Sequence, residues 1–150
     1  MTIGRGVKDI GDSAFDECKS LEGVTIPKSV RTIGESAFSH CVKLGSVIIE
    51  EGVKYIGESA FDCCESLKNV ISPESVLEIA DSAFWGCKSL ISVKIENASI
   101  EIGYNVFDFC DSLCVIHYFG TKRQWKAITK GEAWVEDIDE IHCFDGVFKY

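Results

Sequence analysis

The chain has 150 residues, of which 46% are hydrophobic and 26% are charged, a composition typical of a folded globular domain rather than a disordered segment. Fifteen Lys and Arg residues stand against 24 Asp and Glu residues, and the formal net charge of -9 argues against nucleic acid as a partner, because its phosphates would be repelled. The chain contains no run of about 18 apolar residues, so the sequence predicts no membrane span. The N-terminus lacks the charged-then-apolar pattern of a signal peptide.

A six-residue phrase occurs five times along the chain at a constant spacing of 23 residues. Residues 33–38 read Ile-Gly-Glu-Ser-Ala-Phe, and the other four copies begin at Ile10, Ile56, Ile79 and Ile102. A constant period of this size predicts a solenoid, because each unit is too small to bury its own apolar side chains and must pack against its neighbours.

The first residues already belong to a repeat, since residues 2–7 align with residues 25–30. End units of a solenoid normally carry a polar cap, because their outer apolar side has no neighbour. We therefore expect the chain to be a fragment of a longer protein, with Met1 added or internal. The missing signal-peptide pattern then says little about location.

Aligned positions form apolar columns that should build the core. In the second copy these columns run through Ile33, Phe38, Leu44, Val47 and Ile49. Burying such side chains is worth roughly 1.5 to 3 kcal/mol each, a gain that exists only when repeats stack; Ser72 is the one polar intruder in the last column. Val47 and Ile49 alternate with Ile48, which predicts short strands that pair in parallel from repeat to repeat.

Two polar columns predict the local geometry between the strands. The glycine column, Gly11, Gly34, Gly57 and Gly103, indicates either a positive φ or a close approach of two backbones. The column two positions after the glycine contains only good N-cap residues: Ser13, Ser36, Ser59, Ser82 and Asn105. It predicts a short helical turn. The acidic column, which lies between the glycine and serine columns, would complement the positive end of that turn. A calcium site in that acidic column lacks the ligand spacing of a known loop, so we predict no metal there.

The full pattern resembles a known repeat family. Residues 10–30 read Ile-Gly-x-Ser-Ala-Phe-x-x-Cys-x-x-Leu-x-x-Val-x-Ile-Pro-x-Ser-Val, which is similar to the BspA-like leucine-rich repeats, also called the Treponema pallidum type. The resemblance spans about residues 2–118 and implies an α/β solenoid, a curved leucine-rich-repeat stack with a parallel sheet on its concave face. Members are surface or secreted proteins of bacteria and some protists, several of which adhere to host proteins. Departures at Glu50, Ser72 and Glu96, and throughout residues 96–106, concern local turn geometry.

Five of the eight cysteines form one column, three residues after the Phe and three before the Leu. They are Cys18, Cys41, Cys64, Cys87 and Cys110. Free cysteine packs as a small hydrophobe, so we favour a ladder of buried thiols. Disulfides between neighbouring repeats stay open as the alternative, because a one-repeat separation lies within the permitted Cα range. Zinc is disfavoured, since no Cys-x-x-Cys pair occurs. Outside the column, Cys63, Cys114 and Cys143 are the expected exposed or reactive thiols.

The 23-residue period stops at Phe119, and residues 119–150 have a different character. Thr121 followed three residues later by Gln124 is a capping-box pattern and predicts a short helix that Gly131 would end. Asp145-Gly146, between two short apolar runs, indicates a hairpin-like end. We expect these residues to cap the open end of the solenoid of residues 1–118, and they also resemble the segment that often follows such repeats in surface proteins of gut bacteria.

No catalytic, phosphate-binding or metal-ligating motif occurs, so we predict no enzyme, no cofactor and no metal. An enzyme that uses Cys143 as nucleophile and His142 as base is an alternative. Neighbouring residues of a strand point to opposite faces, however, so these two side chains should not hydrogen-bond to each other.

The remaining hypothesis is that the protein binds a partner through its surface. The outward strand positions are the first candidates for the binding residues. The outward column is Thr25, Ile48, Ile71, Lys94 and His117. Ile48 and Ile71 should be adjacent and exposed, as at an interaction site, although exposed apolar residues are common and Ile suits strands in any case. Trp85 and Phe109 form a possible second patch on another side.

These patterns predict a non-enzymatic protein-interaction or adhesion module of a cell-surface or secreted protein. A host extracellular-matrix or surface protein is one candidate ligand. A structural spacer that holds other domains away from a surface and binds nothing itself is the alternative.

Overall fold

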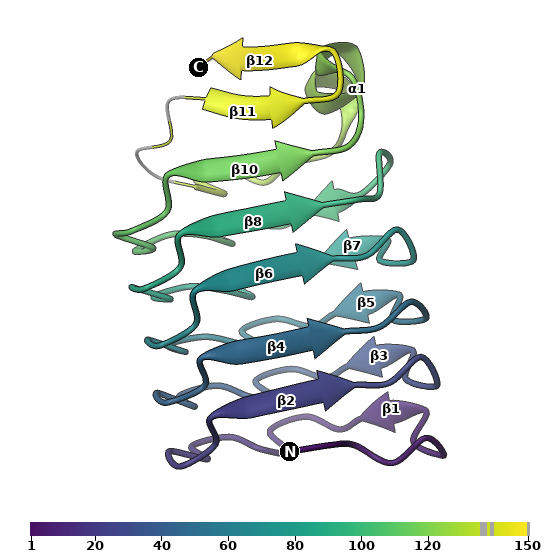
Figure 1. Ribbon diagram of the computed structural model, residues 1–150, viewed down its shortest axis with the longest axis vertical. Helices are drawn as coiled ribbons and strands as arrows, with labels where there is room; N and C mark the ends of the chain where they lie inside the picture. The colour runs from purple at the N-terminus through teal and green to yellow at the C-terminus, as the bar shows by residue number, and fades with distance from the viewer. Residues whose placement is uncertain (136–137, 139, 150) are drawn as a thin grey trace.

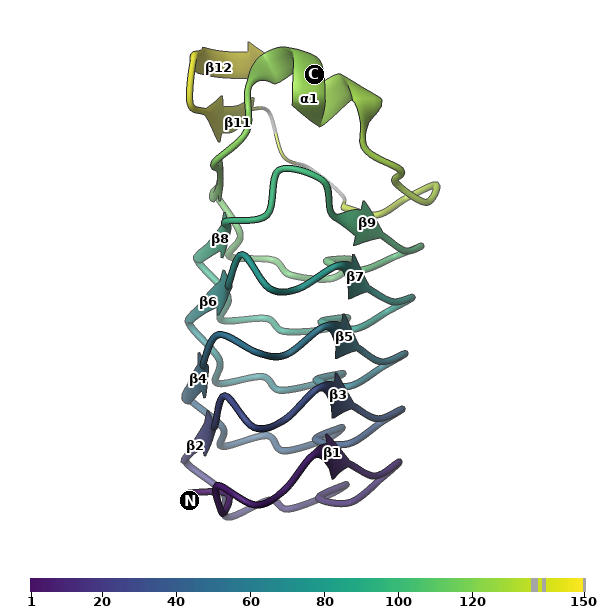
Figure 2. The same cartoon turned by 90° about the vertical axis from the view of Figure 1, so that its right-hand side faces the viewer.

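Each repeat forms one coil of a solenoid, with a four-residue strand on one side and a two-residue strand on the other (Figure 1, Figure 2). The computed structural model describes residues 1–135, 138 and 140–149. The four-residue strands are β2 (Gly23–Ile26), β4 (Ser46–Ile49), β6 (Asn69–Ser72), β8 (Ser92–Ile95) and β10 (Val115–Tyr118). The two-residue strands are β1 (Asp9–Ile10), β3 (Thr32–Ile33), β5 (Tyr55–Ile56), β7 (Glu78–Ile79) and β9 (Glu101–Ile102).

Paired strands of successive coils run parallel and keep the register of the repeat. Ile10 lies opposite Ile33 in the two-residue strands, and Val24 lies opposite Val47 in the four-residue strands. The expected leucine-rich-repeat stack with parallel sheets is therefore confirmed. Thr2 bridges to Thr25, so the residues before β1 add an incomplete coil to the five that end in the four-residue strands.

The turns between β3 and β4 show how the coils are joined, and they are not helical. Within the coil, the N–H groups of Ala37 and Ser39 donate to the carbonyls three residues before them, at 3.3 and 3.1 Å. The N–H groups of Ser36, Phe38 and His40 instead donate to carbonyls of the next coil, each at 2.8 Å. A helix would direct every N–H along its own axis and leave none for the neighbouring coil.

The helical turn predicted from the Ser column is therefore wrong. Ser13, Ser36, Ser59, Ser82 and Asn105 have φ between 53° and 55°, which is the left-handed region. The acidic column has a corresponding role: the Asp12 Oδ1 accepts a hydrogen bond from the Glu35 N–H of the next coil at 2.9 Å, and the Asp81 Oδ1 accepts one from Tyr104 at 2.8 Å. These carboxylates link coils rather than complement a helix end.

A stack of phenylalanine rings runs through the core. The ring centroids of Phe15, Phe38, Phe61, Phe84 and Phe107 follow one another at 5.1, 5.2, 5.2 and 5.7 Å, with the rings nearly parallel. Aromatic pairs add about 0.5 to 1.5 kcal/mol each beyond the area that they bury. This column therefore ties each coil to the next.

The cysteine column forms a ladder of free thiols beside the phenylalanine stack. Cys41, Cys64, Cys87 and Cys110 are buried, and each thiol donates to the carbonyl of the Phe in the preceding coil at 3.1 to 3.3 Å. Burial raises the pKa of the Cys41 thiol to about 11, so this thiol is protonated at neutral pH. Cys18 differs from the expectation: it is exposed, because no earlier complete coil covers it.

Thiol reactivity should follow this division. In native protein, a thiol reagent should modify Cys18 and Cys114, which are exposed, and should react slowly or not at all with the four buried thiols. Denaturant without reductant should release all eight. If denaturation releases no further thiols until a reductant is added, the column is disulfide-bonded and the ladder is wrong.

The sheet of four-residue strands is interrupted between β4 and β6. These strands lie side by side (Figure 1), but the backbone ladder joins β2 to β4 and, separately, joins β6 through β8 and β10. Glu50 and Glu96 donate their N–H groups to the preceding coil just after their strands, and Pro73 at the same position has no N–H to donate. Ser72 beside it is fully buried, and its Oγ has no hydrogen-bond partner.

Replacing Ser72 with Ala should stabilise the fold. The change removes a buried hydroxyl that makes no hydrogen bond while keeping almost the same volume, so the free energy of unfolding should rise by about 1 kcal/mol. Ser46→Ala, on the exposed side of β4, is the control and should stay within about 0.5 kcal/mol. Denaturant melts of both variants test this, and a loss of stability in Ser72→Ala would show that its hydroxyl is satisfied.

The tail begins with the predicted helix. Helix α1 (Lys122–Ala127) has a complete capping box: the Thr121 Oγ1 accepts from the Gln124 N–H at 3.2 Å, and the Gln124 side chain accepts from the Thr121 N–H at 2.9 Å. The helix ends earlier than expected, because Ile128 is already extended. Gly131 therefore does not end it.

Beyond the helix, the chain returns to the stack and completes another coil. Gly131 donates its N–H to Ile102 at 2.8 Å, and Trp134 accepts from Phe107 at 2.8 Å, the same bonds that earlier coils make. Strand β11 (Glu140–Cys143) then pairs in parallel with β10, and β12 (Gly146–Lys149) folds back on it as the predicted hairpin. The sequence period ends near Phe119, but the coiling of the backbone does not.

In the glycine column of the repeats, and at Gly131 in the tail, glycine is needed for the close approach of two backbones, not for a positive φ. A Cβ at Gly57 would lie 2.8 Å from backbone atoms of the preceding coil, and one at Gly131 would lie 2.5 Å from the Tyr104 nitrogen. At Gly11, no atom lies within 4 Å of the added Cβ. A positive φ, which the sequence left open as an explanation of the glycine column, is thus excluded.

Gly131→Ala tests whether the tail is part of the stack. The added methyl group must push two coils apart, so we expect a loss of about 1 to 3 kcal/mol in the free energy of unfolding. Gly11→Ala makes the same chemical change in open space and should cost less than about 0.5 kcal/mol. Equal stability of the two variants would remove residues 128–134 from the stack.

Candidate functional site

The outward side chains of the four-residue strands form the candidate site, and we call this surface the long-strand face. Alternation along each strand buries Val70 and its counterparts and turns the third strand position to solvent. Ile48 and Ile71 are 58% and 50% exposed. Because β4 and β6 are neighbours (Figure 1), the two isoleucines form an apolar pair at the centre of the row β2, β4, β6 and β8.

Toward the C-terminus, the same column becomes polar and charged. Lys94 and His117 lie opposite each other in β8 and β10. The Lys94 Nζ lies 2.9 Å from the Glu96 Oε1 and 4.6 Å from the ring centroid of Phe119. The ammonium group is thus held in place over an aromatic ring. Thr25, at the other end of the column, is half-buried and pairs with Ile48.

The tail extends this column by two residues that sequence reasoning missed. His142 of β11 lies opposite His117, with ring centroids 5.2 Å apart, and Val147 of β12 lies opposite His142. The His142 Nε2 lies 3.1 Å from the Glu140 Oε1. The outward column of the repeats recurs once per period, whereas the separation of His117 and His142 in the sequence is longer than one period. The regular spacing therefore could not align these two histidines.

Trp85 and Phe109 meet in the turns of neighbouring coils, with ring centroids 4.9 Å apart. Phe109 is 52% exposed and Trp85 is half-buried. Asp108 lies next to Phe109, and burial raises the pKa of its carboxyl group. The two aromatic side chains of the second patch are therefore together on the turn side of the stack.

His142 and Cys143 do not form a nucleophile and its base. His142 lies in the exposed column beside His117, whereas Cys143 lies opposite the buried Tyr118. Burial raises the pKa of the Cys143 thiol, and the nearby Asp145 adds to this effect. A nucleophilic cysteine needs the opposite shift.

The chain belongs to the family of the BspA type leucine rich repeat region, whose model matches residues 1–118 with six copies. No curated protein matches the chain. The repeats of this family are typical of protein-interaction modules and are generally not enzymes.

Three solved structures are similar to the chain. A leucine rich cell surface protein from Faecalibacterium prausnitzii A2-165 is 36% identical over 86% of this chain and 34% of that one, with a TM-score of 0.82. The Treponema pallidum leucine rich repeat protein is 29% identical over 83% of this chain and 62% of that one, with a TM-score of 0.72. A leucine-rich repeat protein from Bacteroides ovatus ATCC 8483 is 25% identical over 97% and 42%, with a TM-score of 0.70.

The chain therefore spans from about one third to less than two thirds of the length of these proteins. Within the part of the chain that the structure describes, no helix has the length and apolarity needed to cross a membrane.

Proposed function

We propose that the chain is a protein-binding module of a cell-surface or secreted protein and that the long-strand face holds its ligand. The observation that carries the proposal is the exposed apolar pair Ile48 and Ile71, since contiguous exposed apolar side chains tend to mark interaction sites. Lys94 and His117 supply charge and hydrogen-bonding groups on the same column. A partner that fits has an apolar centre with acidic or hydrogen-bond-accepting groups to one side.

The cell-surface description of the Faecalibacterium protein supports the location. An extracellular-matrix or surface protein of a host is the proposed class of ligand, because adhesion is the role that the family resemblance implies. Trp85 and Phe109 are proposed as a second, smaller contact area on the turn side.

The double variant Ile48→Glu/Ile71→Glu tests the binding face. Both side chains are exposed, so the far-ultraviolet circular dichroism and the melt should stay close to those of the unchanged protein, within about 0.5 kcal/mol per change. Retention on immobilised extracellular-matrix extract should fall by at least about tenfold, because two carboxylates would be buried without partners in an interface.

Tyr55→Glu/Leu77→Glu is the matched control. These residues are 45% and 43% exposed and lie on the side of the two-residue strands, so the control changes the charge equally and should retain binding. A folded Ile48/Ile71 variant with undiminished binding would move the site elsewhere, with Trp85 and Phe109 as the next residues to change. No retention of the unchanged protein on extracts from several sources would favour the spacer.

A further inference from the structure

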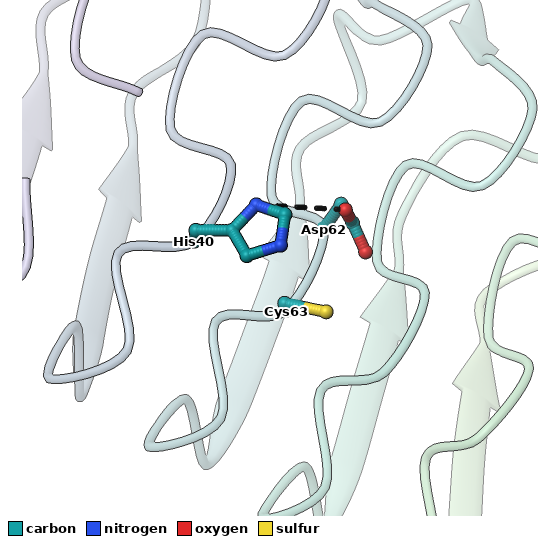
Figure 3. Close-up of side chains that lie close together, drawn as sticks. All are labelled: His40, Asp62 and Cys63. Atoms are coloured by element: carbon teal, nitrogen blue, oxygen red, sulfur yellow. Dashed lines mark ion pairs between the residues drawn. The ribbon is translucent and has the colours of Figure 1, made fainter. Parts of the chain in front are cut away.

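Three potential metal ligands come together on the turn side of two neighbouring coils. His40 and Cys63 occupy the same column, two residues after Phe38 and Phe61, and Asp62 directly precedes Cys63. One ligand atom from each residue lies within 4.8 Å of those of the other two, and no other group of three or more such side chains in the described residues is as close. Figure 3 shows the three side chains projecting into the same space.

The Asp62 carboxylate has an incomplete set of partners. Its Oδ2 lies 3.9 Å from the His40 Nδ1 and 3.5 Å from the Ser39 hydroxyl, whereas its Oδ1 is buried and has no hydrogen-bond partner. The side chain of Asp62 is 18% exposed and that of His40 is 51% exposed. The Asp62 carboxylate is largely buried and one of its oxygens has no partner, while the neighbouring imidazole of His40 is exposed to solvent. This arrangement is suited to receive a cation.

The donor atoms indicate which cation. We propose that His40, Asp62 and Cys63 bind a divalent cation of the zinc class, with water in the fourth position. Imidazole nitrogen, carboxylate oxygen and thiolate sulfur together are a zinc set, whereas calcium and magnesium take oxygen ligands. Ligands of a tetrahedral zinc ion lie about 3.4 Å apart, so the His40 Nδ1 and the Asp62 Oδ2 need to approach by only about half an ångström.

The surroundings fit such a site. The Ser39 Oγ lies 2.7 Å from the His40 Nδ1, and a cation on this nitrogen would replace that hydrogen bond. Glu17 occupies the same column one coil earlier, and its carboxylate is already paired with Lys19 at 3.0 Å. Binding of the ion through the Cys63 sulfur would release the thiol proton.

Such a cation would clamp two coils together. His40 belongs to the coil of β4, and Asp62 and Cys63 belong to the coil of β6, so the ion would span the junction at which the backbone ladder of the four-residue strands is interrupted. A ligand that binds only the folded chain stabilises it. Zinc should therefore raise the melting temperature in a concentration-dependent manner.

The experiment is a titration of the reduced full chain with Zn²⁺ by calorimetry and with Co²⁺ by absorption spectroscopy. We expect one ion per chain, and we expect the Co²⁺ complex to show thiolate charge-transfer and tetrahedral ligand-field bands. His40→Gly, Cys63→Gly and Asp62→Asn should each weaken binding by at least about tenfold. Glycine is chosen because Gly86 occupies this column, with a positive φ, in the next coil, so the backbone tolerates it.

Two control variants remove similar groups elsewhere. Cys114→Ser removes an exposed thiol outside the cluster, and His117→Ala removes an imidazole of the long-strand face; both should bind the ion as the unchanged chain does. Failure of the chain to bind either metal would overturn the proposal. Binding that survives Cys63→Gly, or that is lost in either control, would overturn it as well.

Discussion

Backbone hydrogen bonding between coils at strand spacing is the constraint on which the rest of this structure depends. Parallel strands lie about 4.8 Å apart, and the turns must keep the same distance although they contain no strand. They do so by dividing their N–H groups: Ala37 and Ser39 close turns within the coil, while Ser36, Phe38 and His40 reach the next one. Left-handed residues at two positions in each coil make that division possible.

Stacking at this spacing restricts each inward column to side chains that pack well on copies of themselves. Flat phenylalanine rings do so at centroid distances of 5.1 to 5.7 Å. Thiols do so by donating to a carbonyl one coil earlier, and glycine does so by having no Cβ at all. Ser72 is the exception in a core column, and it lies next to Pro73, where the ladder of strands is broken.

The sequence predicted the columns and the faces of the strands because both depend on strict periodicity, that of the repeat between coils and that of alternating side chains within a strand. It misled where one residue type serves two geometries. Serine is a good N-cap but also tolerates the left-handed region when the next coil accepts its N–H, so Ser36 predicted a helix that is not there. The pattern also concealed the last coil, because the stretch from Gly103 to Gly131 includes a helix and is longer than one period.

The cluster of His40, Asp62 and Cys63 was missed for a third reason: its members are adjacent only across coils. A search along the chain for metal motifs compares neighbours in sequence, whereas a solenoid brings together residues one period apart. His40 and Cys63 are separated by one full repeat, and aligning the repeats places them in one column. In repeat proteins, ligand sets should therefore be sought down the columns as well as along the chain.

The junction between the coils of β4 and β6 joins the two proposals physically. On one side it carries the exposed pair Ile48 and Ile71; on the other it carries the proposed cation site. Between them, the strands lack a continuous ladder. Because stability in a solenoid is a sum of contacts between nearest neighbours, this junction depends on side chains more than the others do. A cation held by His40, Asp62 and Cys63 would fix the distance between the coils that carry Ile48 and Ile71, without touching the proposed binding face.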